Sequence, residues 1–143
     1  MTEVPIWRLN LMRAMYLVMA VGLALTVWPI IVDHDLSMPR MTGVALAMLG
    51  TIGVLAVLGL RYPLQMLPLL LFELVWKILW LAAFALPLWS RDMVDEAHAG
   101  TIFDTSLGAV LLLVIPWGYV WRRYVRRPAE PWRREAEAQT AAA

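Results

Sequence analysis

Four long apolar segments, separated by short polar breaks, dominate the pattern of this chain. They cover approximately residues 12–32, 42–60, 64–89 and 101–121. Each is close to the roughly 20 residues that a helix needs to cross about 30 Å of hydrocarbon at about 1.5 Å per residue. The pattern therefore predicts an all-α, polytopic membrane protein with four transmembrane helices.

The breaks between these segments have the local chemistry of turns. They read "DHDLSMPR", "RYP" and "SRDMVDEAHAG", and they combine charges with proline or glycine. The second break is so short that the second and third helices must form an antiparallel hairpin. Pro68 leaves two interpretations open, because the third helix either kinks at this residue or begins there, with "RYPLQML" as an interfacial prelude.

Composition supports this class of protein. Of the 143 residues, 62% are hydrophobic and only 16% are charged, which lies outside the usual range of soluble domains. We expect one transmembrane domain over residues 1–121 and a basic, partly disordered tail over residues 122–143. The chain has no cysteine, which excludes disulfides, thiolate nucleophiles and cysteine-ligated metals.

The basic residues near the helix ends predict an orientation, because cytoplasmic segments carry an excess of Lys and Arg. The termini and the second break contain Arg8, Arg13, Arg61, Arg122, Arg123, Arg126, Arg127, Arg133 and Arg134. The other two breaks and their borders contain Arg40 and Arg91 against Asp33, Asp35, Asp92, Asp95, Glu96 and Asp104. We therefore expect both termini in the cytoplasm.

The third segment carries two ionisable residues inside the run "FELVWKILW". Glu73 and Lys77 fall near its centre, where each charge costs roughly 2.5–3.5 kcal/mol on insertion scales. Their spacing of four residues places them on one helix face, in the better of the two orientations. Trp76 and Trp80 share this face, and Trp80 lies one turn from Lys77, where a cation–π contact is expected.

Two interpretations of this pair stay open, besides contact with the helix of another protein. In the first, Glu73 and Lys77 form a satisfied buried ion pair that fixes the packing of the third helix. In the second, Glu73, Lys77, Trp76 and Trp80 line a cavity and form a ligand or proton site, as intramembrane ionisable residues often do.

The remaining candidate residues lie near the ends of the predicted helices. His34 and His98 have carboxylates nearby in sequence and are weak candidates for a metal site, although their spacing matches no ligand motif. Asp104 is expected to cap the start of the fourth helix. The tail arginines Arg122, Arg123, Arg126 and Arg127 are expected to contact anionic lipid headgroups rather than nucleic acid.

Small residues recur along the second helix. They are Gly43, Ala47, Gly50, Gly53, Ala56 and Gly59, and Gly43 with Ala47 forms a small-xxx-small step. Such residues allow the backbones of two helices to approach closely. We expect ordinary packing within the bundle from them, with contact to another subunit as the alternative.

Two stretches carry a resemblance to known proteins. "LRYPLQMLPLLLFELVWKILWLAAFALPLW" (Leu60 to Trp89), and "VIPWGYVWRRYV" followed by "PWR", resemble a group of small bacterial inner-membrane proteins with four predicted helices. The resemblance implies the same fold and location, and it implies no activity. A looser similarity to small multidrug-resistance transporters rests on size and one membrane glutamate, but theirs is unpaired and lies in the first helix.

These observations predict a non-catalytic bundle that self-associates or serves as an accessory subunit of a membrane complex. Its expected partners are the lipid bilayer and either itself or another membrane protein. The alternative is a small transporter or ligand-binding protein that uses Glu73 and Lys77. No catalytic motif and no cofactor-binding motif is present in the sequence, so we do not expect an enzyme or a cofactor.

Overall fold

The computed structural model describes residues 4–130, and within this part of the chain every regular element is a helix. Four helical segments are long and apolar enough to cross a membrane: Ile6–Val32, Arg40–Arg61, Leu67–Ser90 and Glu96–Val114. An all-α chain with four such segments is therefore confirmed. The bounds of the segments differ from the sequence prediction at several ends, and each difference has a local cause.

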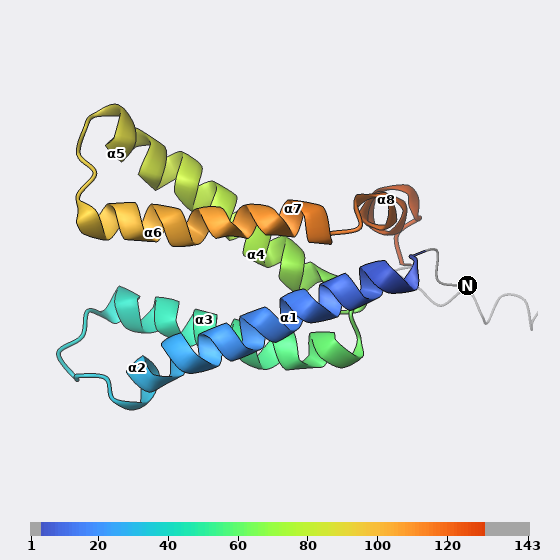
Figure 1. Ribbon diagram of the computed structural model, residues 1–143, viewed down its shortest axis with the longest axis horizontal. Coiled ribbons are helices and arrows are strands. Elements are labelled where there is room, and N and C mark those ends of the chain that lie inside the picture. The colour runs from blue at the N-terminus through green and yellow to red at the C-terminus, as the bar shows by residue number, and fades with distance from the viewer. Residues whose placement is uncertain (1–3, 131–143) are drawn as a thin grey trace, which may run out of the picture.

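The first two segments form a closely packed hairpin (Figure 1). Helix α1 (Ile6–Thr26) continues into the short helix α2 (Trp28–Val32), and α3 (Arg40–Arg61) returns alongside it. Helix α1 begins six residues before the predicted start. The fixed φ of Pro5 suits a helix entrance, and the helix continues through Arg8 and Arg13, which an apolar pattern alone does not include.

Small residues explain how closely α1 and α3 approach. Gly50, Gly53, Ala56 and Gly59 are all buried in α3. A Cβ added at Gly53 would lie 3.1 Å from Cβ of Leu23, and one added at Gly59 would overlap the ring of Tyr16. Gly43, in contrast, has open space around it. Gly53 and Gly59, in the second half of α3, therefore provide the expected packing within the bundle, and Gly43 does not.

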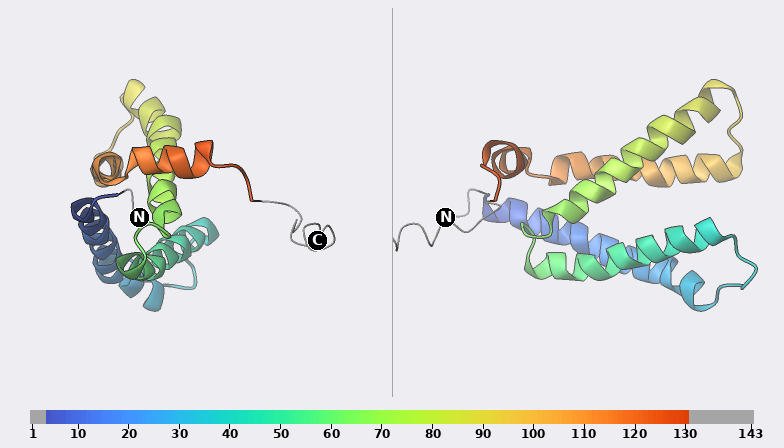
Figure 2. Two further views of the ribbon diagram at one scale, coloured as in Figure 1. Left: turned by 90° about the vertical axis from the view of Figure 1, so that its right-hand side faces the viewer. Right: turned by 180° about the vertical axis from the view of Figure 1, so that it is seen from behind.

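The second hairpin contains the third and fourth segments. The third consists of α4 (Leu67–Trp80), a π-helical turn η1 (Leu81–Ala85) and α5 (Leu86–Ser90). The fourth consists of α6 (Glu96–Ser106), a 3₁₀ turn η2 (Leu107–Ala109) and α7 (Val110–Val114). The two hairpins lie close together near the N-terminal end of the chain and diverge toward the opposite end (Figures 1 and 2).

Proline determines one end of each helix in the second hairpin. Helix α4 begins at Leu67 and has Pro68 in its first turn, so the helix begins at this proline rather than kinking there. The fourth segment ends at Val114 and not near residue 121. Ile115 has an extended backbone with ψ of 125°. The ring of Pro116 disfavours the helical conformation for the residue before it.

After this break the chain turns sideways. Helix α8 (Trp117–Val120) and the π-helical turn η3 (Trp121–Arg126) run crosswise to the long axis of the bundle, at the end where α1 begins (Figures 1 and 2). The start of α1 and this crosswise segment therefore lie at the same end of the bundle. The residues 131–143 of the predicted tail, with Arg133 and Arg134, lie outside the described residues.

The buried core is centred where the two hairpins meet. Its members come from α1, α3, α4 and α7 and include Met12, Tyr16, Met19, Ile52, Ala56, Leu67, Leu70, Leu74, Leu111 and Val114. Tyr16 is fully buried, and its hydroxyl donates a 3.0 Å hydrogen bond to the carbonyl of Pro63 in the turn between α3 and α4. This tyrosine thereby ties the first helix to the hairpin connection.

We predict that Gly59→Ala destabilises the protein, because the added methyl group would overlap the ring of Tyr16. Overpacking of this kind costs about 1–3 kcal/mol. The free energy of unfolding, measured in detergent with denaturant, should fall by this amount. Gly43→Ala in the same helix is the matched control and should leave stability unchanged or slightly raised, since the site is open. Equal effects of the two variants would contradict the packing role of Gly59.

Candidate functional site

The site begins with a carboxylate buried in an apolar helix. Glu73 lies in α4 and is only 6% exposed. Its neighbours Leu70 and Leu74 on the same helix belong to the buried core. Helical spacing brings the side chains three and four residues later onto the same face. Those side chains belong to Trp76 and Lys77.

Both oxygens of this carboxylate have a donor. The Lys77 ammonium lies 2.9 Å from Oε1 of Glu73, and Nε1 of Trp76 donates a 2.7 Å hydrogen bond to Oε2. We call Glu73, Trp76 and Lys77 the Glu73 cluster. The ion pair agrees with the spacing in the sequence. The indole hydrogen bond was missed by sequence reasoning, although the spacing of three residues is the signal that could have found it.

Lys77 makes a second contact within the cluster. Its Nζ lies 4.3 Å from the centroid of the Trp76 ring, within the range of a cation–π interaction. The sequence had suggested Trp80 as the ring for this contact, and the structure places Trp76 there instead. Trp80 is partly exposed one turn further along α4. The contacts of the cluster therefore join Glu73, Trp76 and Lys77, and the fourth candidate, Trp80, is not among the residues that these contacts join.

Gly108 in the fourth segment lies directly against the Lys77 side chain. Gly108 is buried in η2, and a Cβ added there would overlap Cδ of Lys77 and lie 2.9 Å from its Cε. The alkyl part of Lys77 therefore packs directly on the backbone of the fourth segment. A lone glycine in an apolar stretch does not reveal such a contact in the sequence, because only the tertiary structure brings residues 77 and 108 together.

An apolar groove lies between α3 and α4, beside the cluster. It consists of two adjoining cavities of about 190 and 490 Å³. The smaller is lined by Ala45, Met48, Leu49, Ile52, Phe72 and Trp76. The larger is lined by Val44, Ala47, Met48, Thr51, Ile52, Leu55, Leu69 and Phe72. Trp76 is the member of the cluster that lines the groove, whereas Glu73 and Lys77 do not line either cavity.

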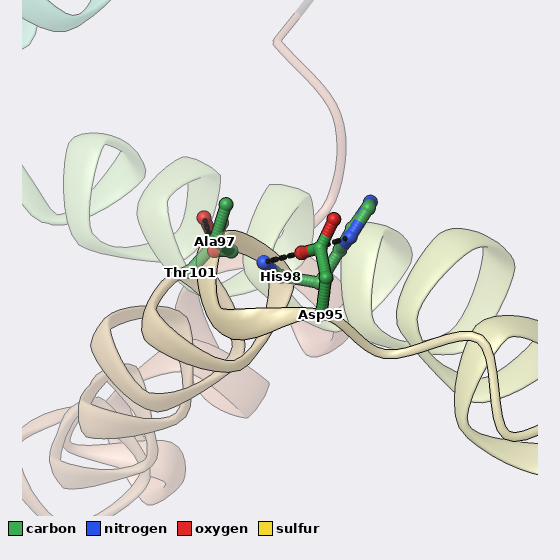
Figure 3. A network of polar contacts seen from close by, with 4 residues as sticks. All are labelled: Asp95, Ala97, His98 and Thr101. Carbon is green, nitrogen blue, oxygen red and sulfur yellow. Dashed lines mark hydrogen bonds and ion pairs between the residues drawn. The ribbon is translucent and has the colours of Figure 1, made fainter.

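One histidine lies in a loop and the other in a helix of the second hairpin. His34 follows α2, and its Nδ1 lies 2.7 Å from the carbonyl oxygen of Ile31. His98 is in the first turn of α6, and its Nδ1 lies 2.6 Å from Oδ1 of Asp95 (Figure 3). Among residues 4–130, no group of three or more His, Cys, Asp and Glu side chains is arranged to hold a metal ion. The structure does not bring the two weak metal candidates together.

Asp95 and not Asp104 caps the fourth segment. Oδ1 of Asp95 accepts a 2.7 Å hydrogen bond from the backbone N–H of His98, which satisfies a free donor at the start of α6 (Figure 3). Asp104 lies within α6, two turns later, and is exposed. The prediction placed the cap too late because it counted the helix from its first apolar residues. A helix begins at its capping group, and polar residues can occupy its first turns.

The four tail arginines are placed on the crosswise segment and directly after it. Arg122, Arg123 and Arg126 belong to η3, Arg127 follows it, and all four are exposed. Trp117, Trp121 and Tyr124 are partly exposed on the same segment. Aromatic and cationic side chains together are typical of a helix at a membrane interface.

Comparison with known proteins adds no relative. No protein-family model matches the chain, and no curated protein or solved structure is significantly similar to it.

We predict that Asp95 makes the stability of the protein dependent on acid pH. Hydrogen bonds from the backbone and ring of His98 hold the pKa of the Asp95 carboxyl below its usual value of 3.8. The ionised form is therefore favoured in the folded state, so its stabilisation is present above pH 4 and is lost as the pH falls through the lowered pKa. Asp95→Ala should be less stable than wild type at pH 6, and this difference should shrink toward pH 3.

Thermal unfolding in detergent between pH 6 and pH 3 measures this difference. Asp104→Ala is the matched control, because Asp104 is an exposed carboxylate of the same helix and does not cap it. This variant should follow the wild-type pH profile. A larger loss of stability from Asp104→Ala than from Asp95→Ala would indicate that Asp104 caps the helix after all.

Proposed function

We propose that the protein is a small, non-catalytic component of a bacterial inner membrane, in which the Glu73 cluster fixes the rotation and packing of the third helix. In this proposal the bundle self-associates or serves as an accessory subunit of a membrane complex. The observation that carries the proposal is that the cluster is closed. Each oxygen of Glu73 has a donor within the same helix, and the alkyl part of Lys77 is covered by Gly108.

A closed cluster suits a structural role better than a transport role. A proton or substrate site needs a polar path to the ionisable group. The adjoining cavities are lined almost entirely by apolar side chains, and they reach Trp76 but not Glu73 or Lys77. A buried pair of this kind contributes little net stability relative to apolar residues, yet losing one partner is costly because the other charge is left uncompensated. Its use is therefore specificity of packing.

The distribution of charge supports an orientation with both termini in the cytoplasm. Arg8 and Arg13 in the first half of α1, Arg61 at the end of α3 and the arginines of η3 all belong to the end of the bundle where the chain starts. Carboxylates are concentrated at the other end, among them Asp33, Asp35, Asp92, Asp95 and Glu96. Excess arginine marks the cytoplasmic side.

The small share of buried residues in the four segments supports association with another helix. In the most apolar windows of the four segments, between 17% and 28% of the residues are buried within the chain. Most residues of each segment thus expose part of their side chain to lipid or to other helices. In hydrocarbon, close packing of such surfaces can hold subunits together without a large buried area of polar contacts.

A ligand-binding function is the second candidate, and the groove between α3 and α4 is the observation that favours it. Its walls would accept an apolar molecule, and Trp76 would connect an occupant to the Glu73 cluster through the indole hydrogen bond. In this alternative, Glu73 and Lys77 sense the ligand indirectly rather than binding it.

The test of the proposed role is a double-mutant cycle with Glu73→Gln and Lys77→Met. Each single variant should lower the free energy of unfolding by about 3–5 kcal/mol, because it leaves a buried charge unpaired. The double variant should lose much less than the sum of the two single losses. Unfolding in detergent and yield of folded protein are the measurements. Arg91→Gln and Asp92→Asn, in the exposed turn after α5, are matched controls and should show no coupling.

Additive losses in this cycle would count against a structural pair. The ligand-binding alternative would be favoured if all variants keep wild-type stability while the melting shift caused by an apolar ligand disappears.

We predict the orientation separately. Fusions of a reporter that is active only in the cytoplasm should give signal at the N-terminus, after Tyr62 and after Arg127. Fusions after Leu36 and after Met93 should give none, since these loops lie at the opposite end of the bundle. A signal from either of these two loops would overturn the orientation and leave the role of the Glu73 cluster untouched.

A further inference from the structure

The crosswise segment, which consists of α8 and η3, leaves the direction of the four long helices at Pro116 (Figures 1 and 2). One side of it is held by the bundle, because Tyr119 and Val120 pack against the buried core. The other residues from 117 to 126 are exposed. The segment therefore combines a side that is fixed to the protein with a side that is open to the surroundings.

Specific contacts build the corner at which this segment turns away. A helix that ends leaves its last carbonyls without a donor from the helix itself. At the end of α7, Nε1 of Trp117 donates a 2.8 Å hydrogen bond to the carbonyl of Leu112. Nη2 of Arg8 donates a long, 3.5 Å hydrogen bond to the carbonyl of Leu113. Side-chain donors at both carbonyls support a built corner rather than a frayed end of the fourth span.

The open side of the crosswise segment combines aromatic and cationic side chains. Tryptophan and tyrosine are enriched at the level of lipid headgroups, and arginines close to a membrane surface are attracted to anionic lipids. Residues 117–127 include no carboxylate that could neutralise the arginines locally. Arg122 has an interaction of its own, so the argument rests on the other arginines. The exposed residues that carry it are Trp117, Trp121, Tyr124, Arg123, Arg126 and Arg127.

The surface of an anionic membrane is the partner that complements this open side. A segment that runs crosswise to membrane-spanning helices would lie parallel to the bilayer plane, where its rings and its guanidinium groups reach the headgroups together. Further positive charge belongs to the same end of the bundle, with Arg13 in the first half of α1 and Arg61 at the end of α3. The charge at this end is therefore opposite to that of an anionic lipid surface.

We propose that the crosswise segment is an interfacial anchor, which lies in the plane of the membrane surface and binds the headgroups of anionic phospholipids through Arg123, Arg126 and Arg127. The sequence predicted headgroup contacts for the tail arginines, and the corner at Pro116 adds the in-plane direction of the segment. The anchor rests on the membrane location proposed above, and it is independent of the role of the Glu73 cluster.

The depth of single labels tests the direction of the segment. The chain has no cysteine, so one introduced cysteine takes one spin label. Full-length Gly118→Cys, Val125→Cys and Leu79→Cys are labelled in phospholipid nanodiscs, and depth is measured from collisions with oxygen and with a water-soluble nickel complex. Leu79 is exposed near the middle of the third span. We expect positions 118 and 125 at one depth near the headgroups and position 79 deep in the hydrocarbon.

Two depth results would overturn the anchor alone, provided that position 79 is deep. One is a depth difference of about 10 Å between positions 118 and 125, the length of seven helical residues along the membrane normal. The other is that both of these positions lie in water. A label in water at position 79 would instead overturn the membrane location, and the anchor with it.

A fluorophore on Val125→Cys tests for the anionic headgroup. Its quenching by brominated phosphatidylglycerol and by brominated phosphatidylcholine gives the relative binding of the two lipids beside the segment. We expect a preference of about fivefold for phosphatidylglycerol, the effect of about one arginine close to an anionic surface. This preference should weaken as the salt concentration rises, because salt screens exposed charges.

Paired substitutions separate the segment from the charge of the whole protein. Arg123→Gln with Arg126→Gln should lower the preference below about twofold, since most of the local attraction is removed. Arg40→Gln with Arg91→Gln is the matched control, because it removes the same charge from exposed positions at the opposite end of the bundle. The control pair should leave the preference unchanged, and an equal loss from both pairs would overturn the anchor. No preference for phosphatidylglycerol before substitution would also overturn it and would favour an acidic protein surface as the partner.

Discussion

The constraint on which this structure depends is that polar groups inside an apolar bundle must find partners within the chain. In hydrocarbon no water satisfies them, and each unpaired group is costly. Glu73 meets the constraint with donors from Lys77 and Trp76 on its own helix. Tyr16 meets it across the bundle by donating to the carbonyl of Pro63. The packing of Lys77 on Gly108 holds the third segment against the fourth, and the hydrogen bond of Tyr16 holds the first helix against the α3–α4 turn.

The same constraint shapes the helix ends and the smaller polar residues. Arg13 donates to the carbonyl of Leu60 at the end of α3, and Nε1 of Trp117 donates to the carbonyl of Leu112 where α7 stops before Pro116. Hydroxyl groups bond back to the carbonyl one turn earlier; they belong to Thr26, Thr51, Thr101 and Ser106. The chain can therefore place hydroxyls, an indole and an arginine in or beside its apolar segments, because backbone carbonyls accept from each of these side-chain donors.

The proposed function depends on which buried polar groups have a partner within the chain. At the Glu73 cluster each carboxylate oxygen, the indole N–H and the Lys77 ammonium has a partner, and Trp76 is the residue of the cluster that lines the apolar groove. A group whose bonds are complete is suited to fixing a shape and poorly suited to exchanging a proton. Arg8 is the exception within the described residues, because its Nε is buried without an acceptor.

The amino-acid pattern by itself determined the helical class and the four apolar segments, and it placed Glu73 and Lys77 on one helix face, because these depend on composition and on spacing within one helix. It left open whether the two side chains bond to each other, which the structure shows. It also indicated that Pro68 could mark a helix start. Only the tertiary structure decided that Gly108 makes room for Lys77, that Gly59 receives Tyr16 and that Arg8 meets the start of α8. Each joins residues more than thirty positions apart, and a local pattern holds no information on which distant backbone will approach.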